Sequence, residues 1–302
     1  MLVYRVQDLV KVYPGQREAA NDHIGLEVGE GEVLGILGDN GAGKTTLVRQ
    51  MVNLLRSTSG RIELYGEPVG RDPLRVPRLV GYMPQESRAL NNLTVGEALY
   101  FTAHLRGLSR RDAQAERERL LELWEIGPLC DQISNRLSGG QGRLLRLAVA
   151  TAGAPPVLVL DEPTNDLDPQ RRRLVWNVLC RINQERGSTI LFITHDAIEA
   201  EKVVQRVAIM RRGQMAAVGR PSELKRLVDR KLRLELFFPP DAPPPLPPHL
   251  APRQLQPGRW LVLLDRDEAL RVLADLDQDH LDDWRLYSAT LEDLYLHYAQ
   301  DA

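Results

Sequence analysis

GDNGAGKTT, residues 38–46, is the most informative segment of this 302-residue chain. An apolar run at 33–37 (VLGIL) precedes it and predicts a buried strand. LVRQMVNLL at 47–55 follows it with apolar residues at helical spacing, up to a turn near Ser57. A strand, a glycine-rich turn and Lys-Thr at the start of a helix together predict a loop that binds the phosphates of a nucleotide. The alternative is a glycine-rich turn that binds nothing, but four positions match the pattern in the strand-to-helix context that it requires.

The residue types of this loop suit an anion. The glycines at 38, 41 and 43 are expected to take positive φ angles and to let the backbone approach a phosphate. Lys44 can reach the β- and γ-phosphates, and the Thr45 hydroxyl is placed to ligate Mg²⁺. The expected contacts to the nucleotide come from the whole segment: Gly38, Asp39, Asn40, Gly41, Ala42, Gly43, Lys44, Thr45 and Thr46. The sequence therefore predicts a site for a nucleoside triphosphate.

Composition sets broad limits on the protein. The net charge of −2 gives no reason to expect nucleic acid as a partner. Cys130 and Cys180 are too few and too far apart for a disulfide framework, and they fit a reduced cytosolic protein. The first residues lack the pattern of a signal peptide, and the apolar runs are shorter than the ~20 residues of a membrane helix. We therefore expect no direct insertion into a membrane, and any membrane role would need another chain.

The pattern of elements predicts two domains. Aliphatic strand runs alternate with helical patterns over residues 1–230, which predicts an α/β domain with a mainly parallel sheet. Residues 239–252 (PPDAPPPLPPHLAP) then hold eight prolines in fourteen positions. This segment is typical of an extended polyproline linker, with a ligand for a proline-recognition domain as the alternative. Strand and helix patterns on both sides of it, from 231 to 302, predict a small α+β accessory domain.

An acidic pair follows a second buried strand. VLVLDE at 157–162 places Asp161 at the carboxyl end of that strand, at the edge of the sheet where the glycine-rich loop is expected. A carboxylate there can hold Mg²⁺ through water, and Glu162 is placed to orient or deprotonate an attacking water. The alternative, an acidic turn without a function, is less consistent with a chain that already carries a phosphate-binding loop.

Two further segments distinguish this chain from other nucleotide-binding enzymes. LSGGQ at 137–141 opens a helix and forms a second anion site, which one triphosphate seldom needs from one chain. TNDLDP at 164–169 follows the acidic pair, and Thr194, His195 and Asp196 end the next strand. With these segments in this order, residues 1–230 resemble the nucleotide-binding subunit of an ATP-binding cassette (ABC) transporter. The resemblance implies a P-loop NTPase fold with a helical subdomain at about 88–150.

The resemblance also implies roles for residues around the nucleotide. Tyr13 would stack on the adenine, although an ordinary tyrosine at a strand end is the alternative. Gln85 would contact Mg²⁺ or the attacking water and would sense the membrane partner. His195 would contact the γ-phosphate and, with Glu162, hold the geometry that activates water.

The LSGGQ helix would act across a dimer, according to the same resemblance. Its residues would bind the γ-phosphate held by a second ATP-binding subunit, identical or closely related: Ser138, Gly139, Gly140 and Gln141. Asp168 would stand at the dimer interface, in the loop that links the two sites. The chain departs from the family pattern at Asn165 and Asp166, which replace smaller residues, and at Gly142, where a basic or bulky residue is usual. These departures concern the strength of the dimer contact and leave the chemistry intact.

These expectations combine into an ATP-hydrolysing subunit that powers a membrane transporter. It would bind a transmembrane permease at the cytoplasmic face of the membrane, and the last helix, TLEDLYLHYA, resembles the ends of subunits from export-type pumps. Closure of two subunits around ATP and Mg²⁺ would drive the permease. One alternative is a cassette ATPase that acts on ribosomes or DNA, although such proteins usually carry two cassettes or a long insertion. Another is a small-molecule kinase, for which LSGGQ would have no role.

Overall fold

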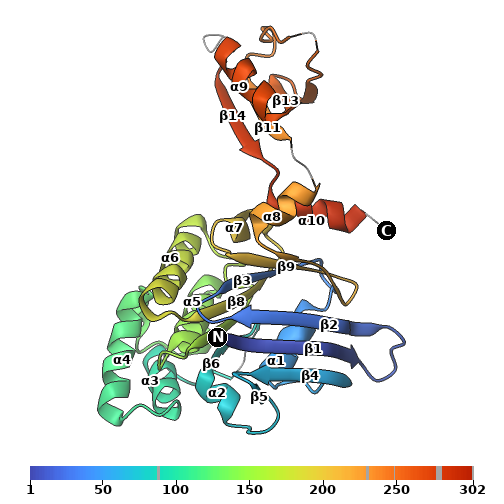
Figure 1. Cartoon of the computed structure of the whole chain (residues 1–302). Coiled ribbons are helices and arrows are strands. Elements are labelled where there is room, and N and C mark those ends of the chain that lie inside the picture. Colours follow the sequence, from blue (N-terminus) through green and yellow to red (C-terminus); the bar gives the residue numbers. More distant parts are fainter. Residues whose placement is uncertain (87–88, 229–230, 248, 277–280, 301–302) are drawn as a thin grey trace. The chain divides into compact units, whose positions relative to one another are not determined.

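The computed structural model describes residues 1–302 except 87–88, 229–230, 248, 277–280 and 301–302. The chain divides into two compact units, Met1–Arg220 and Pro221–Ala302, which we call the first and the second unit (Figure 1). The predicted division of function at residue 230, between an ATP-binding and an accessory domain, stays a prediction. In the structure, helix α8 (Pro221–Val228) belongs to the second unit, where it packs against α10 (Leu291–Gln300).

A mainly parallel sheet forms the centre of the first unit. Its order is β10-β9-β3-β8-β7-β6; only the edge strand β10 is antiparallel to its neighbour. The strands are β3 (Val33–Leu37), β6 (Val80–Met83), β7 (Val157–Asp161), β8 (Thr189–Thr194), β9 (Arg206–Arg211) and β10 (Gln214–Gly219). Every residue of β3, β7 and β8 is buried, as expected for parallel strands that are covered on both faces. The predicted α/β class is confirmed.

A separate antiparallel sheet covers the parallel one. It consists of β1 (Leu2–Val12), β2 (Ala19–Gly29), β4 (Ser59–Leu64) and β5 (Glu67–Pro68) in the order β2-β1-β4-β5. Helix α1 (Lys44–Met51) packs with both sheets in one apolar cluster that includes Tyr4, Leu47 and Val159. The sequence predicted these strands but not that they form a layer of their own. The cluster fixes the position of α1, and so of the loop before it.

Helices occupy the other side of the parallel sheet (Figure 1). They are α3 (Val95–Leu105), α4 (Arg110–Leu123), α5 (Gly139–Thr151), α6 (Pro169–Arg186) and α7 (Ala197–Glu201), with short 3₁₀ turns η1 (Gly127–Leu129) and η2 (Ser134–Arg136). Helix α2 (Arg75–Leu79) instead packs through Val76 into the apolar cluster that contains α1. Thr94 and Glu97 form a capping box that starts α3, and Ser109 caps α4. Gly107, at φ 106°, separates the two helices. Polar capping residues thus determine where α3 and α4 begin.

The second unit is a small α+β domain, as the sequence predicts. It contains α8, β11 (Leu232–Phe237), β12 (Arg253–Gln256), β13 (Arg259–Leu264), α9 (Arg266–Asp275), β14 (Asp283–Ser288) and α10, and the sheet order is β12-β13-β11-β14. The proline-rich segment 239–252 joins β11 to β12 of this one sheet; its residue 248 lies outside the described residues. Leu250 packs into the apolar core of the unit and Leu246 packs against that core, so the segment is part of this domain.

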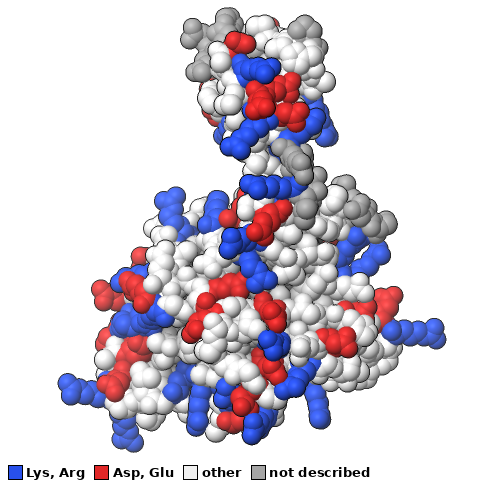
Figure 2. Space-filling view, in the orientation of Figure 1, with Lys and Arg blue, Asp and Glu red and all other residues white. Residues whose placement is uncertain are grey.

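The charged side chains are mixed on the surface. Figure 2 shows Lys and Arg side chains interspersed with Asp and Glu over the face of the first unit, consistent with a net charge of −2. Within the described part of the chain, no helix has both the length and the apolar character needed to cross a bilayer.

Candidate functional site

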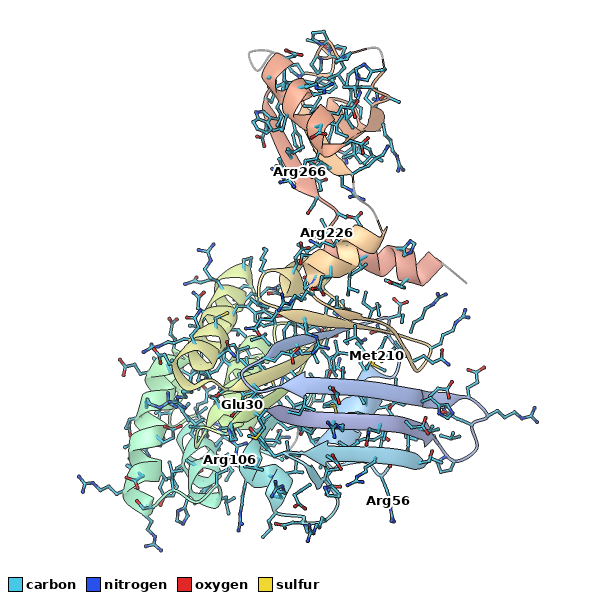
Figure 3. The ribbon with its side chains drawn as sticks, viewed as in Figure 1. Glu30, Arg56, Arg106, Met210, Arg226 and Arg266 are labelled. Atoms are coloured by element: carbon cyan, nitrogen blue, oxygen red, sulfur yellow. The ribbon has the colours of Figure 1, made fainter. Side chains whose placement is uncertain are left out.

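The glycine-rich loop runs from the end of β3 at Leu37 to the start of α1 at Lys44. Gly41 and Gly43 have φ angles of 86° and 98°, as the sequence predicts. Gly38 does not, and that part of the prediction was wrong: a Cβ at Gly38 would lie 2.4 Å from the carbonyl oxygen of Met210 on β9, labelled in Figure 3. The absence of a side chain at Gly38 thus allows the start of the loop to approach β9 closely.

Lys44 folds back over the loop. Its ammonium donates to the carbonyl oxygens of Gly38 at 2.6 Å and Asp39 at 3.0 Å, and the residue is buried. Burial lowers the pKa of Lys44, although the carboxylates of Glu162, Asp161 and Asp39 oppose this effect. The side chain therefore places a cation beside the backbone N–H groups of the loop and the N-terminus of α1, where a phosphate would find several donors.

Most of the residues predicted to contact the phosphates and Mg²⁺ line one cavity of about 250 Å³, but Gly38, Tyr13 and His195 do not. Gln85 follows β6, Asp161 ends β7 and Glu162 comes directly after it, so all three lie at the carboxyl edge of the parallel sheet. The lining residues are Ala20, Asp39, Asn40, Gly41, Ala42, Gly43, Lys44, Thr45, Thr46, Gln85, Asp161, Glu162 and Ile193. Five stretches that are separate in the sequence thus form one polar cavity.

Asp161 is a buried carboxylate without a hydrogen-bond partner. The residue is 1% exposed, and neither carboxylate oxygen has a partner at hydrogen-bond distance. Burial raises the pKa of Asp161, with the nearby Thr45 hydroxyl acting in the opposite direction. An unpaired buried carboxylate is costly unless it binds a cation. Asp161, Thr45 and Gln85 offer the oxygen ligands that Mg²⁺ prefers, so the residues present fit this ion.

Glu162 adopts an uncommon backbone conformation, with φ at 52°. Its carboxylate Oε1 lies 2.9 Å from Nδ1 of His195, which comes from the end of β8, and its backbone N–H donates to the carbonyl of Ile193 at 3.0 Å. The guanidinium of Arg143 donates to the carbonyl of Glu162. Left-handed residues other than glycine are concentrated at functional sites, where their surroundings impose the strain. The structure brings Glu162 and His195 together, as the sequence predicts.

Sequence reasoning missed a buried polar pair that supports the loop. Asn21, on β2, is fully buried; its amide donates to the carbonyl of Gly43 at 3.0 Å and accepts from Gln50 at 2.7 Å. An asparagine at a buried position of a strand is the signal that could have identified it. Tyr13 also lies beside the loop, because its hydroxyl is 3.2 Å from the Thr46 hydroxyl.

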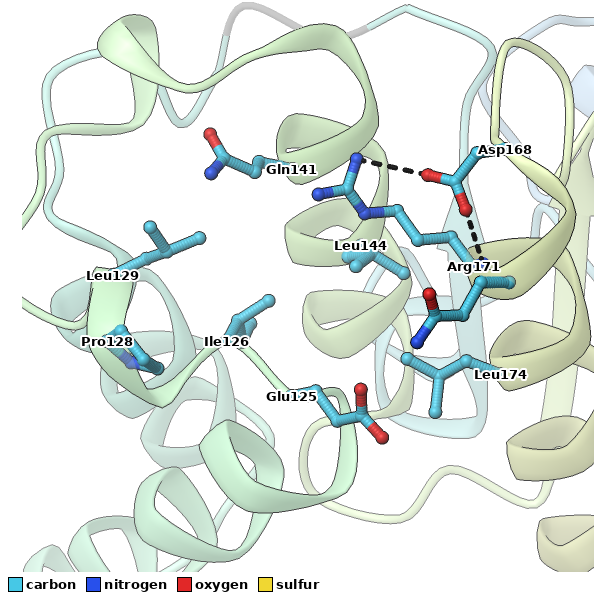
Figure 4. Close-up of a pocket in the computed structure, with 10 residues that line it drawn as sticks. Glu125, Ile126, Pro128, Leu129, Gln141, Leu144, Asp168, Arg171 and Leu174 are labelled. Carbon is cyan, nitrogen blue, oxygen red and sulfur yellow. Dashed lines mark hydrogen bonds and ion pairs between the residues drawn. The ribbon is translucent and has the colours of Figure 1, made fainter.

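The LSGGQ residues are separate from the phosphate cavity. Ser138 and Gln141 form a capping box at the N-terminus of α5. The Ser138 N–H donates to the Gln141 side-chain oxygen at 3.0 Å, and the Gln141 N–H donates to the Ser138 hydroxyl at 3.4 Å. Figure 4 shows that Gln141 and Asp168 instead face another cavity, of about 420 Å³. Asp168 caps α6 by accepting from the backbone of Arg171, and this hydrogen bond lowers the pKa of Asp168.

The family model described as ABC transporter matches residues 21–165, a range that holds the glycine-rich loop, the LSGGQ helix and the acidic pair. A relative, ATP-binding cassette sub-family A member 7 of Rattus norvegicus, is 34% identical over 315 aligned residues, which cover 98% of this chain. The chain belongs to the ABC transporter ATP-binding cassettes. The cassette is also 36% identical over 223 residues, 73% of its length, to the phospholipid-transporting ATPase ABCA3 of Homo sapiens.

The fold of the cassette matches solved structures of the same kind. One is cbiO1 from Clostridium perfringens, described as part of the ABC transporter complex cbiONQ: it has a TM-score of 0.65 and 28% identity, with 75% of this chain and 94% of that chain covered. The cassette spans only 14% of the rat relative and 13% of the human one.

Proposed function

We propose that the cassette binds ATP with Mg²⁺, hydrolyses the ATP and so supplies energy to a transport protein in a membrane. The observation that carries this proposal is the convergence, in one cavity, of the glycine-rich loop with the unpaired carboxylate of Asp161 and with Glu162, whose carboxylate contacts His195. The relatives named above support transport as the use of this energy, and they give no support to action on ribosomes or DNA.

Each residue of the cavity has a distinct task in this proposal. The loop N–H groups and Lys44 bind the phosphates, and Tyr13 stacks on the adenine. Mg²⁺ when bound, held by Thr45, Gln85 and Asp161, supplies positive charge to the phosphate oxygens. Glu162 orients the water and accepts its proton, while His195 holds the Glu162 carboxylate through the 2.9 Å contact and reaches the γ-phosphate.

A second subunit completes the site. The first N–H groups of a helix have no partner inside it, and at α5 they follow Ser138 on a surface outside the phosphate cavity. In this structure, therefore, the glycine-rich loop and the N-terminus of α5 of one chain cannot both contact the same triphosphate. Two copies, or a close relative, placed head to tail would bring Ser138, Gly139, Gly140 and Gln141 to the partner's γ-phosphate, with Asp168 at the interface.

The permease would dock in an apolar groove of about 430 Å³ on the first unit. Leu54, after α1, Leu74, before α2, and Leu105, at the end of α3, line it and are 67%, 58% and 83% exposed. A short amphipathic segment of the permease would cover these side chains and so hold the cassette at the cytoplasmic face. Export is the proposed direction, and the name of the human relative makes a phospholipid the first substrate to test.

Steady-state hydrolysis by the purified chain tests the chemistry. Glu162→Gln should keep ATP binding, lower turnover by at least ~100-fold and yield an ATP-dependent dimer on a sizing column, because the amide cannot accept the proton. Lys44→Ala should lose ATP affinity. The control Glu185→Gln alters an exposed glutamate on α6 and should behave as wild type. Wild-type turnover in Glu162→Gln, or unchanged affinity in Lys44→Ala, would contradict the proposal.

A further inference from the structure

Two residues of the loop between β7 and α6 have left-handed backbones. Glu162 has φ at 52° and Asp166 has φ at 59°, and neither is a glycine. Such conformations are disfavoured for side chains with a Cβ and persist only where surrounding contacts impose them. The loop therefore needs contacts that hold it in this form, and Glu162 is the residue to which the proposed function assigns proton transfer.

One guanidinium contacts both of these residues. Arg143, in the second turn of α5, donates through Nη1 to the carbonyl oxygen of Glu162, and its Nη2 lies 3.5 Å from Oδ2 of Asp166. The Arg143 side chain is 7% exposed, whereas that of Asp166 is 76% exposed. A hydrogen bond from a buried cation to a carbonyl is strong, while an ion pair with an exposed carboxylate adds little. The bond to Glu162 is thus the main contact.

The planar guanidinium also suits this position. Its donors lie in a fixed fork, so one side chain can bind the two sites of the loop at once, which an ammonium cannot do in the same geometry. Burial lowers the pKa of Arg143, but Asp166, Glu162 and Asp161 oppose that effect, so the carboxylates around it favour the charged form. Arg143 does not line the phosphate cavity, so it acts on the site through Glu162.

We propose that Arg143 is a positioning residue: its hydrogen bond to the carbonyl of Glu162 holds that residue in the left-handed conformation that aims its carboxylate at the attacking water. The proposal rests on the proposed function, because it assumes that Glu162 accepts a proton from water. It assigns to α5 a second task, since the helix that begins with the LSGGQ residues also sets the orientation of the catalytic carboxylate. This contact joins residues 19 positions apart in the sequence.

The test compares turnover with ATP binding. Arg143→Met keeps an apolar stem but removes every donor; it should lower kcat about tenfold at an unchanged Kd for ATP, since a lost charge-assisted hydrogen bond is typically that large. Arg143→Lys keeps one donor and the charge and should recover part of the loss. Arg206→Met is the matched control, because Arg206 also bonds a carbonyl, of Glu27, and a carboxylate, of Glu32, away from the cavity.

A double-mutant cycle separates positioning from general damage. If Arg143 acts only through Glu162, adding Arg143→Met to Glu162→Gln should not lower the residual single-turnover rate further. The same tenfold loss in both backgrounds, or wild-type kcat in Arg143→Met, overturns the proposal. Should Arg143→Met fail to fold, Arg143→Lys decides: a reduced kcat at wild-type Kd supports positioning, and a wild-type kcat overturns it. An inactive wild-type chain would instead refute the proposed function.

Discussion

Replacement of Gly43 by alanine should destabilise the nucleotide-free protein far more than the same change at Gly41. Both residues have left-handed backbones, with φ at 98° and 86°, so both variants incur a strain of about 1–2 kcal/mol. They differ in the space available. A Cβ at Gly43 would lie 2.1 Å from the carbonyl oxygen of Ala20 and 2.7 Å from the Asn21 amide, whereas a Cβ at Gly41 meets no atom within 4 Å.

The additional cost at Gly43 follows from these contacts. The carbonyl of Ala20 is backbone in β2 and cannot rotate away, so the strand or the loop must shift, at a cost of about 1–3 kcal/mol. The shift would also weaken the bond from Asn21 to the Gly43 carbonyl, a further ~1 kcal/mol. We expect a total of about 3–6 kcal/mol for Gly43→Ala and about 1–2 kcal/mol for Gly41→Ala.

Urea unfolding without nucleotide, followed by circular dichroism, measures the difference. With an m-value of about 2 kcal/mol/M, the midpoint of Gly43→Ala should fall about 1 M or more below that of Gly41→Ala. Equal midpoints for the two variants would refute the reasoning, because the backbone strain is shared and only the contact with β2 distinguishes them. Loss of ATP binding in both would not do so, since both glycines line the cavity.

Two further substitutions test buried polar groups. Asp161→Asn should raise the free energy of unfolding at pH 7 by about 1–3 kcal/mol while abolishing ATP hydrolysis. Burial raises the pKa of Asp161 in the folded protein above its ordinary value of 3.8, so wild type loses stability as the pH rises between these two values. In urea titrations, the stability gained by Asp161→Asn should therefore shrink as the pH is lowered towards 4. Trp124→Phe removes a fully buried indole that donates to Thr151 at 3.1 Å, and the melting temperature should fall by about 4–10 °C; an unchanged value would contradict the contact.

The predictable part of the site depends on short segments of chain. The positive φ angles of Gly41 and Gly43 follow from the turn between β3 and α1, and the capping box of Ser138 and Gln141 from their spacing. The end of α1 shows the limit of such reasoning, because the apolar spacing predicted a helix to about Ser57. The helix ends at Met51, where Asn53 turns left-handed at φ 59° and Leu54 bonds back to Arg49 at 2.8 Å.

The sequence by itself determined the class of fold, the phosphate-binding loop and the two carboxylates after β7, because each arises from residues that are neighbours in the chain. Three contacts are visible only in the tertiary structure: the close approach of Gly38 to Met210, the hydrogen bond from Asn21 to Gly43, and the hydrogen bond from Arg143 to Glu162. These contacts join segments whose approach depends on the order of the strands in the sheet and on the packing of α5 and β2 against the loops. Periodicity and local spacing do not specify that order, since hydrophobic burial favours any arrangement that covers the same apolar faces.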